Sequence, residues 1–188
     1  MNPRRTAMPA VEPIGLAEAK AHLRIDHADE DNLITALILA AREAAETHTG
    51  LSFISQEWTY ALDQWPEDEG FIRSPRGPLL SLSSIKTYDN ADTATTWGSG
   101  NTFVAIGEDR IYRRAGIAWP VPGRQERGIE ISYVAGFGLL ASDVPPAIRH
   151  ALLIMVAHYY SHRGDGGASS VLPLSASALL APWRARRV

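Results

Sequence analysis

The segment Asp143–Arg163 (DVPPAIRHALLIMVAHYYSHR) places the strongest constraint on the fold of this chain. Every side chain from Ala151 to Ala157 is apolar, and a helix of this composition has to be covered on most of its circumference. The apolar run is much shorter than the about 20 residues that a helix needs to cross a bilayer. We therefore expect the central helix of a soluble bundle or of an oligomer.

The residues at both ends of this segment are typical of helix boundaries. Pro145 and Pro146 suit a first helical turn, where the missing N–H group costs no hydrogen bond. Asp143 can offer its carboxylate to the free amides of that turn, and Gly164 opens a glycine-rich stretch that ends the helix. The residues that we expect on the buried surface of the helix are Ile148, Leu152, Met155, Val156, Tyr159 and Tyr160.

Two further helices are predicted near the N-terminus. In Ile14–Asp26, the residues Leu16, Ala19 and Leu23 recur at helical spacing. The following segment begins with acidic residues, which suit the positive end of a helix, and then carries a broad apolar face rich in alanine. Small side chains allow a neighbouring helix to approach closely, and Gly50 is the expected C-terminal stop.

After the second helix the sequence changes to short segments with a period of two, separated by turn-forming clusters. This pattern predicts an antiparallel β module inserted between the second helix and the central helix. Its long loops, such as residues 89–101 (DNADTATTWGSGN), are expected to be mobile or to bind a partner. The predicted strands are Gln56–Leu62, Leu82–Tyr88, Thr102–Ile106, Arg110–Tyr112 and Gly128–Val134.

Together these patterns predict an α+β fold: a small helical bundle built around one long apolar helix, with an inserted antiparallel β module and a flexible C-terminal arm. The helical core takes residues 14–50 and 142–164, and the β module takes residues 51–141. Residues 1–13 are expected to form a mobile N-terminal arm. Residues 165–188 form the C-terminal arm, which ends in the aromatic and cationic sequence APWRARRV.

The composition argues against several classes of protein. A net charge of -3 argues against a surface that binds nucleic acid throughout. The absence of cysteine excludes disulfide scaffolds, iron–sulfur centres and thiol nucleophiles. The N-terminal sequence has two arginines but no continuous apolar stretch, so we predict neither a signal peptide nor a membrane anchor, and a cytoplasmic product.

No motif gives strong support to catalysis. His158 and His162 stand at a spacing that can place two imidazoles on one metal ion, but the residues between them lack the glutamate of a zinc protease motif. The acidic run from Asp26 to Asp31 lacks the turn glycine and the final glutamate of a calcium loop. Neither a nucleophilic serine motif nor a phosphate loop is present. We therefore expect a protein without enzymatic activity, metal ion or cofactor.

Arginines concentrate in the β module and at the C-terminus. Acidic residues lie among them, which favours a surface held by salt bridges. The alternative is a face that meets DNA phosphate or an acidic protein partner. Since the charges of the module nearly balance, we favour contact with protein. The arginines of the module are Arg73, Arg76, Arg110, Arg113, Arg114, Arg124 and Arg127.

The order of several motifs resembles the head-tail connector (adaptor) family of tailed bacteriophages and gene transfer agents. These motifs are LAEAKAHLRID, DEDNLITALILAAREAAETHTG, YVAGFG, VPPAIRHALLIMVAHYYSHR and LLAPWR. They extend from Leu16 to Arg184, and the insert between Ser55 and Ile129 matches by its pattern, notably SPRGPLLSLSSIKTYD.

The resemblance implies a structural protein that forms a ring, usually of twelve copies, in the neck of a phage or phage-like particle. Such a ring lies between the portal protein and a tail-side neck (stopper) protein, and it provides a channel through which DNA passes without sequence-specific binding. The chain would lie in the bacterial cytoplasm during assembly. The central helix and the face of Leu33–Ala45 are then expected to supply the subunit core and part of the ring contact.

The resemblance also implies that the end of the chain grips the portal. Trp183 is then an apolar anchor, and the neighbouring arginines pair with acidic groups. We expect the segment Val171–Val188 to be flexible alone and ordered on binding. The docking residues are Leu179, Leu180, Pro182, Trp183, Arg184, Arg186 and Arg187.

Two other functions stay open from the sequence. One is a DNA-binding or packaging accessory protein, in which the helix pair Leu16–Thr49 contacts duplex DNA. Retention of DNA that weakens steeply as salt rises would favour it. The other is a metal hydrolase that uses His158 and His162, which stoichiometric zinc in chelator-free protein would favour.

Overall fold

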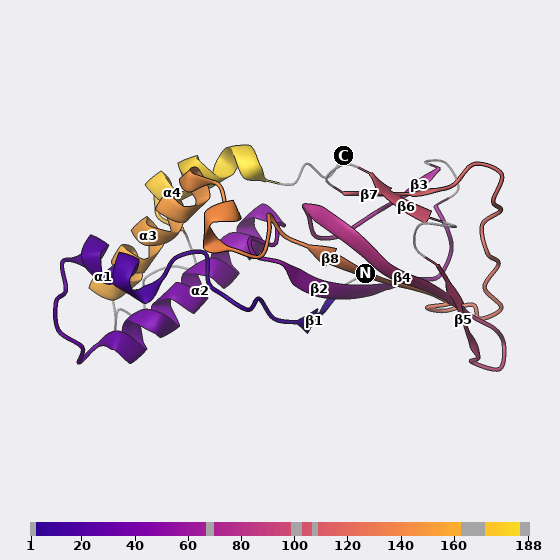
Figure 1. The fold of residues 1–188 in the computed structure, drawn as a ribbon, viewed down its shortest axis with the longest axis horizontal. Coiled ribbons are helices and arrows are strands. Elements are labelled where there is room, and N and C mark those ends of the chain that lie inside the picture. The colour runs from indigo at the N-terminus through magenta and orange to yellow at the C-terminus, as the bar shows by residue number, and fades with distance from the viewer. Residues whose placement is uncertain (1–2, 67–69, 99–102, 107–108, 163–171, 185–188) are drawn as a thin grey trace. The chain divides into compact units, whose positions relative to one another are not determined.

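The structure is a computed structural model that describes residues 3–66, 70–98, 103–106, 109–162 and 172–184 (Figure 1). The chain forms two compact units. The first, which we call the β unit, takes residues 1–9 and 55–137, and the second, the helical unit, takes residues 10–54 and 138–188. The predicted α+β fold is confirmed, with helices in one unit and antiparallel strands in the other.

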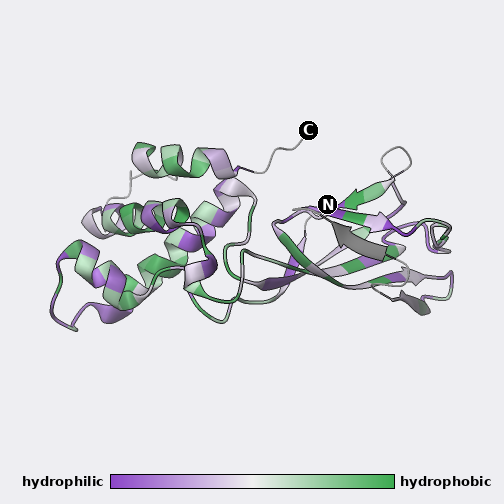
Figure 2. Ribbon diagram, turned by 45° about the horizontal axis from the view of Figure 1, so that its top comes forward, coloured by the Kyte–Doolittle hydropathy of each residue, from purple (hydrophilic) through white to green (hydrophobic). Residues whose placement is uncertain are grey.

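The helical unit is arranged around α3, which packs against each of the other three helices. Hydrophobic residues recur along these helices, as Figure 2 shows in green. The central position that the apolar sequence of α3 predicts is therefore found within a single chain. The elements of the unit are α1 (Leu16–Leu23), α2 (Asp31–Thr49), η1 (Ala141–Asp143), α3 (Pro146–Ser161), α4 (Leu174–Leu180) and η2 (Ala181–Trp183).

The helix ends follow most of the predicted signals. Pro146 takes the first position of α3, and Gly50 ends α2 with a φ of 76°, its N–H donating to the carbonyl oxygen of Glu46. Asp143 does not cap α3, contrary to the prediction. It lies in η1, where its carboxylate accepts the N–H of Leu140 at 2.8 Å. The extended backbone of the next residue separates this turn from the helix.

The described part of the N-terminal segment is not the mobile arm that the sequence predicts. Residues Arg4–Ala7 form β1, an edge strand that pairs with β2 (Gln56–Leu62). The carboxylate of Glu12 accepts a hydrogen bond from Arg42 Nε at 2.7 Å. The sequence RRTA lacks the alternating apolar pattern that would indicate a strand. It forms one nonetheless, because an edge strand such as β1 is held mainly by backbone hydrogen bonds.

The β unit consists of two antiparallel sheets. The larger has the strand order β1-β2-β8-β4-β5 and the smaller has the order β3-β7-β6. Ile72 of β3 and Ile111 of β7 belong to the same hydrophobic cluster as Ile85 and Ile131 of the larger sheet, so the sheets pack face to face. The remaining strands are β3 (Phe71–Arg73), β4 (Leu79–Tyr88), β5 (Ala94–Trp97), β6 (Phe103–Ile106), β7 (Arg110–Arg113) and β8 (Ile129–Ala135).

Two further strands of the β unit were not predicted. β3 is only 3 residues long, and β5 lies inside the predicted loop of residues 89–101. β5 is formed by antiparallel pairing with β4, from Tyr88 opposite Ala94 to Ile85 opposite Trp97. The segment is rich in threonine and lacks apolar alternation, so its own sequence does not indicate a strand. Pairing with β4 in a hairpin makes it one.

Candidate assembly interfaces

Four of the predicted core residues of α3 are covered by their own chain. Ile148 and Met155 are 0% exposed, and Leu152 and Val156 are 1% exposed. These four residues therefore form the core of the helical unit, and neighbouring copies are not needed to cover them. The helix thus supplies the subunit core that the sequence predicts, and α4 provides part of its cover.

The two tyrosines at the end of α3 are half-buried. The hydroxyl of Tyr160 hydrogen bonds to the carboxylate of Glu30. Burial raises the pKa of Tyr159 above its ordinary value. Both side chains thus retain some exposed surface, in contrast to the four core residues of the helix.

A buried ion-pair network holds α2 in the helical unit. Arg42, only 1% exposed, pairs through Nε with Glu12 at 2.7 Å and through Nη1 with Glu46 at 3.0 Å. The other oxygen of Glu46 accepts the N–H of Phe53 at 2.8 Å. Burial by itself lowers the pKa of Arg42, but the hydrogen bond to Glu12 and the charges of Glu46, Glu12 and Glu43 raise it above its ordinary value. Each charge in the network is paired, so the network fixes the position of α2, and removal of one partner would be costly.

The opposite side of α2 is exposed and almost uncharged. Leu39 is 42% exposed at its centre, and Glu43 is the single charged residue among the exposed positions of this fully described helix. Exposed surfaces with few charges and an aliphatic centre are typical of contacts between proteins. We call this surface the α2 outer face, and it consists of Asn32, Thr35, Ala36, Leu39, Ala40, Glu43 and Thr47.

The C-terminal segment contains a short helix that packs on α3. In α4, Ala176 and Leu180 are 0% exposed. Leu180 is therefore a core residue of the helical unit and is not available to a portal, which corrects its prediction as a docking residue. The described part of the segment is folded in the single chain, whereas its sequence predicts a segment that is flexible before binding.

The other predicted docking residues lie at the end of α4 and in η2. Leu179 and Trp183 are half-buried, whereas Pro182 and Arg184 are exposed. Arg186 and Arg187 lie outside the described residues. Pro182, Trp183 and Arg184 are consecutive in the sequence, and the structure gives each of them some exposed surface. Tryptophan and arginine are frequent in binding hot spots.

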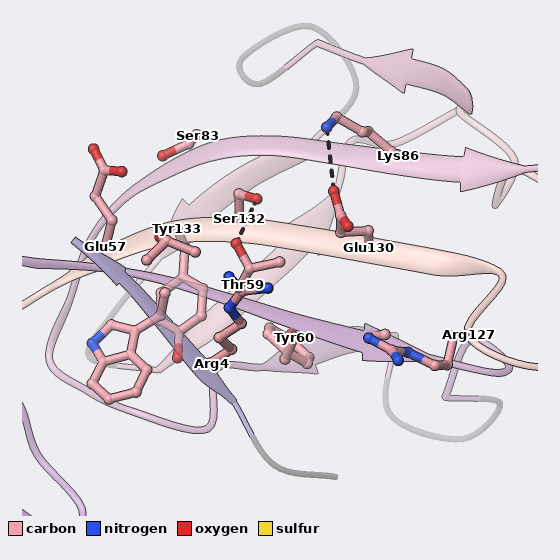
Figure 3. Close-up of a pocket in the computed structure, with 13 residues that line it drawn as sticks. Arg4, Glu57, Thr59, Tyr60, Ser83, Lys86, Arg127, Glu130, Ser132 and Tyr133 are labelled. Carbon is pink, nitrogen blue, oxygen red and sulfur yellow. Dashed lines mark hydrogen bonds and ion pairs between the residues drawn. The ribbon is translucent and has the colours of Figure 1, made fainter. Parts of the chain in front are cut away.

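The outer face of the larger sheet is polar and slightly hollowed, with a volume of about 510 Å³. Figure 3 shows the side chains that line it, including the pairs Thr59 with Ser132 and Lys86 with Glu130. Thr59 and Ser132 are hydrogen bonded at 3.0 Å, and Lys86 pairs with Glu130 at 3.2 Å. Because these polar groups satisfy one another, the hollow has the character of a solvated sheet surface.

Most of the arginines of the β module stack on aromatic rings. Such a guanidinium is attracted to the ring face and is held in place there. Arg73 also pairs with Asp109 at 3.0 Å, and Arg124 with Asp92 at 3.1 Å. The sequence does not reveal this arrangement, because the rings and the guanidiniums meet only in the folded unit. The stacked pairs are Arg73 and Arg110 on Phe71, Arg76 on Trp58, Arg113 on Trp119 and Arg124 on Tyr88.

The two histidines of α3 lie next to each other at the end of the helix. Their ring centroids are 4.3 Å apart, and Nδ1 of His162 is 2.8 Å from the carbonyl oxygen of His158. Over the part of the chain that the structure describes, no group of three or more histidine and carboxylate side chains could hold a metal ion. None of the helices in the same part combines the length and hydropathy needed to span a bilayer.

Solved structures of gene transfer agent particles contain proteins of similar fold. The chain is similar to a protein in the neck of an empty gene transfer agent (GTA) particle, computed with C6 symmetry, with 27% identity, a TM-score of 0.83, and coverage of 100% of this chain and 97% of the other. A protein in the virion of a native GTA particle gives 26% identity, a TM-score of 0.84 and the same coverage. A third, in the neck of a native GTA particle computed with C12 symmetry, gives 27% identity and a TM-score of 0.76 over 98% of this chain and 97% of that one.

A family comparison gives the same result for the first half of the chain. Residues 13–95 match the model of the phage gp6-like head-tail connector proteins. No curated protein sequence matches the chain. The family match and the structural similarities together confirm the resemblance to the head-tail connector family that the order of the sequence motifs indicates.

Proposed function

We propose that this protein is a structural head-tail connector that assembles as a ring of twelve copies in the neck of a phage or gene transfer agent particle. The ring lies between the portal protein and a tail-side neck protein and surrounds a channel for DNA. The protein acts as a structural component and not as an enzyme. A net charge of -3 supports this role, because a strongly cationic channel would hold DNA phosphate.

The similarity to GTA neck proteins over the whole chain carries this proposal. It includes both units, with a TM-score of 0.83 and coverage of 97% of the neck protein. The twelvefold ring is supported by the C12 symmetry applied to the neck that contains a similar chain. A closed ring needs a heterologous contact, in which two different surfaces of one copy meet those of its two neighbours.

The α2 outer face is our candidate for one of these two surfaces. A helix face with few charges loses little solvation when a neighbour covers it, and its alanines allow close helix packing. Leu39, at 42% exposure, is the large apolar side chain of this face. The native mass of the purified protein, alone and mixed with the portal protein, tests the ring. A wild-type chain that is monomeric in both samples would contradict the proposed function.

Leu39→Asp is expected to disrupt the ring and to leave the chain folded. At 42% exposure the new carboxylate stays solvated in the single chain, but a neighbouring copy would bury it, at a cost of several kcal/mol. Native mass spectrometry should show at least about tenfold weaker association, which corresponds to about 1.4 kcal/mol. Val121→Asp places the same charge on a side chain of the β unit that is 90% exposed and is the matched control. A ring of unchanged mass in Leu39→Asp would exclude this face.

Trp183→Ala is expected to weaken binding to the portal protein by about tenfold or more, because truncation of an aromatic hot spot costs about 2 kcal/mol or more. The binding constant of the purified proteins measures the effect, and the circular dichroism of the variant checks its fold. Trp183→Phe should restore part of the affinity. Ser175→Ala, an exposed change on α4, is the control. Equal portal affinity in Trp183→Ala and the wild type would remove η2 from the docking surface.

A further inference from the structure

The outer edge of β5 is an open sheet edge. The N–H of Tyr88 in β4 donates to Gly128, on the side of β8, whereas the N–H of Asp89 donates to Thr93, on the side of β5. Hydrogen-bonding direction alternates along an antiparallel strand. It follows that Thr95 is bonded to β4, and that the backbone N–H and C=O groups of Ala94 and Thr96 point away from the sheet. Among the described residues, neither has a backbone partner on that side.

The two edges of this sheet differ in their protection. The other edge, β1, carries Arg4 and Arg5 and has a register shift before Ala7, and charges and bulges of this kind prevent pairing with another strand. The residues Ala94–Trp97 of β5 contain no charge and no proline, and their pairing with β4 is regular. The unprotected edge is therefore a template for an added strand.

An added strand would also extend the core of the β unit. Trp97 is partly buried against the hydrophobic cluster, and its Nε1 donates to Thr87 Oγ1 at 2.9 Å. Thr95 lies on the same side of β5 as Trp97, because side chains alternate along a strand. Alternate residues of an added strand would pack beside Thr95 and Trp97 and lose contact with water, so they should be apolar.

A second copy of this chain does not supply a suitable strand. In β1, Arg4 and Thr6 line the polar outer face, so Arg5 lies on the core side and would bring its charge next to Trp97. Two β5 edges could pair with each other, but such an isologous contact makes a dimer and does not propagate around a ring.

The acidic residues near β5 indicate which charge one end of the partner segment should carry. The hairpin turn before the strand contains Asp89 and Asp92. Arg124 pairs with Asp92 at 3.1 Å. The carboxylate of Asp89 accepts the N–H groups of Ala91 and Thr93 at 2.8 Å, and no ion pair of Asp89 is found among the described residues. A cationic residue at one end of an added strand would compensate this charge.

We propose that the β5 edge binds an extended segment of another neck protein, which has alternating apolar residues and a lysine or arginine at the end that lies nearer the acidic hairpin turn. The segment adds to the sheet as a further antiparallel or parallel strand beyond β5. This proposal rests on the proposed function in one respect only, which is that the partner is another protein of the neck. The pairing itself follows from the edge geometry.

Thr96→Pro tests this pairing sharply. Its N–H points away from β4, so proline there removes the donor that a partner needs and no hydrogen bond within the chain. The variant should keep its melting temperature and its ring mass, and should show at least a tenfold loss in binding to the neck proteins purified from the particle. Thr96→Val keeps the N–H and should bind as the wild type does. Thr95→Pro removes an N–H bonded to β4 and should lower the melting temperature.

Amide hydrogen exchange on the full chain gives the second measurement. In the free protein, the amides of Ala94 and Thr96 should exchange at least tenfold faster than those of Thr95 and Trp97. In the assembled neck they should become protected. Protection of Thr96 in the ring of the purified protein alone would overturn the proposal, since it would assign the edge to a second copy. Rapid exchange of Thr96 in the neck, or full binding by Thr96→Pro, would also overturn it, and either result would leave the ring intact as a separate finding.

Discussion

Arg42→Ala is expected to lower the free energy of unfolding by about 3–5 kcal/mol, because it leaves a buried carboxylate without its partner. Arg42 is 1% exposed and Glu46 is 4% exposed. Glu46 receives hydrogen bonds from Arg42 and from the N–H of Phe53. Without the guanidinium, the carboxylate of Glu46 would lose its ion pair with Arg42 in a site with little water. Urea denaturation followed by circular dichroism measures the loss.

Two further variants separate this effect from the loss of packing. Glu43→Gln changes a carboxylate that is 48% exposed and 3.9 Å from Arg42, so it should cost less than about 1 kcal/mol. Glu46→Gln in the Arg42→Ala background removes the uncompensated charge and keeps an oxygen for Phe53, so it should recover part of the lost stability. If the double variant is no more stable than Arg42→Ala, the buried charge is not the cause.

The sequence predicts those features of the fold that depend on local signals. The proline pair and the uninterrupted apolar run define α3 without knowledge of its neighbours, whereas the predicted stop at Gly164 lies outside the described residues and α3 ends at Ser161. Gly50 defines the end of α2 in the same way, since its φ of 76° is readily adopted by glycine. The strands with clear alternation, such as β8 with its buried Ile129, Ile131 and Tyr133, were also predicted within a few residues.

Features that depend on distant residues could not be predicted. Arg42 occurs on the apolar side of α2, and the partner that makes this possible, Glu12, lies 30 residues earlier in the chain. β1 and β5 have no apolar alternation of their own and form because β2 and β4 offer backbone groups to them. The stacking of arginines on aromatic rings in the β unit likewise needs the tertiary fold.

The sequence predicts the candidate surfaces only in part, because it does not show which side chains the other helices cover. The apolar content of α3 indicates burial, but it does not indicate which element provides the cover. In the structure α4 provides part of it, which removes Ile148 and Leu152 from the candidate ring contact and Leu180 from the candidate docking surface. The α2 outer face becomes visible only when the buried side of α2, with Ile34 and Ile38, is known.

Leu180→Ala is expected to destabilise the helical unit by about 2–5 kcal/mol, because it leaves a cavity at a fully buried position. Leu174→Ala removes the same atoms from a side chain of α4 that is 88% exposed, and its cost should be close to zero. Urea denaturation of the free protein measures both. If the C-terminal segment were a flexible arm that folds only on the portal, neither change would alter the stability of the free chain. Equal stability of the two variants would therefore contradict the packing of α4 on α3, whereas a large difference means that the chain presents Trp183 from an ordered helix before any partner binds.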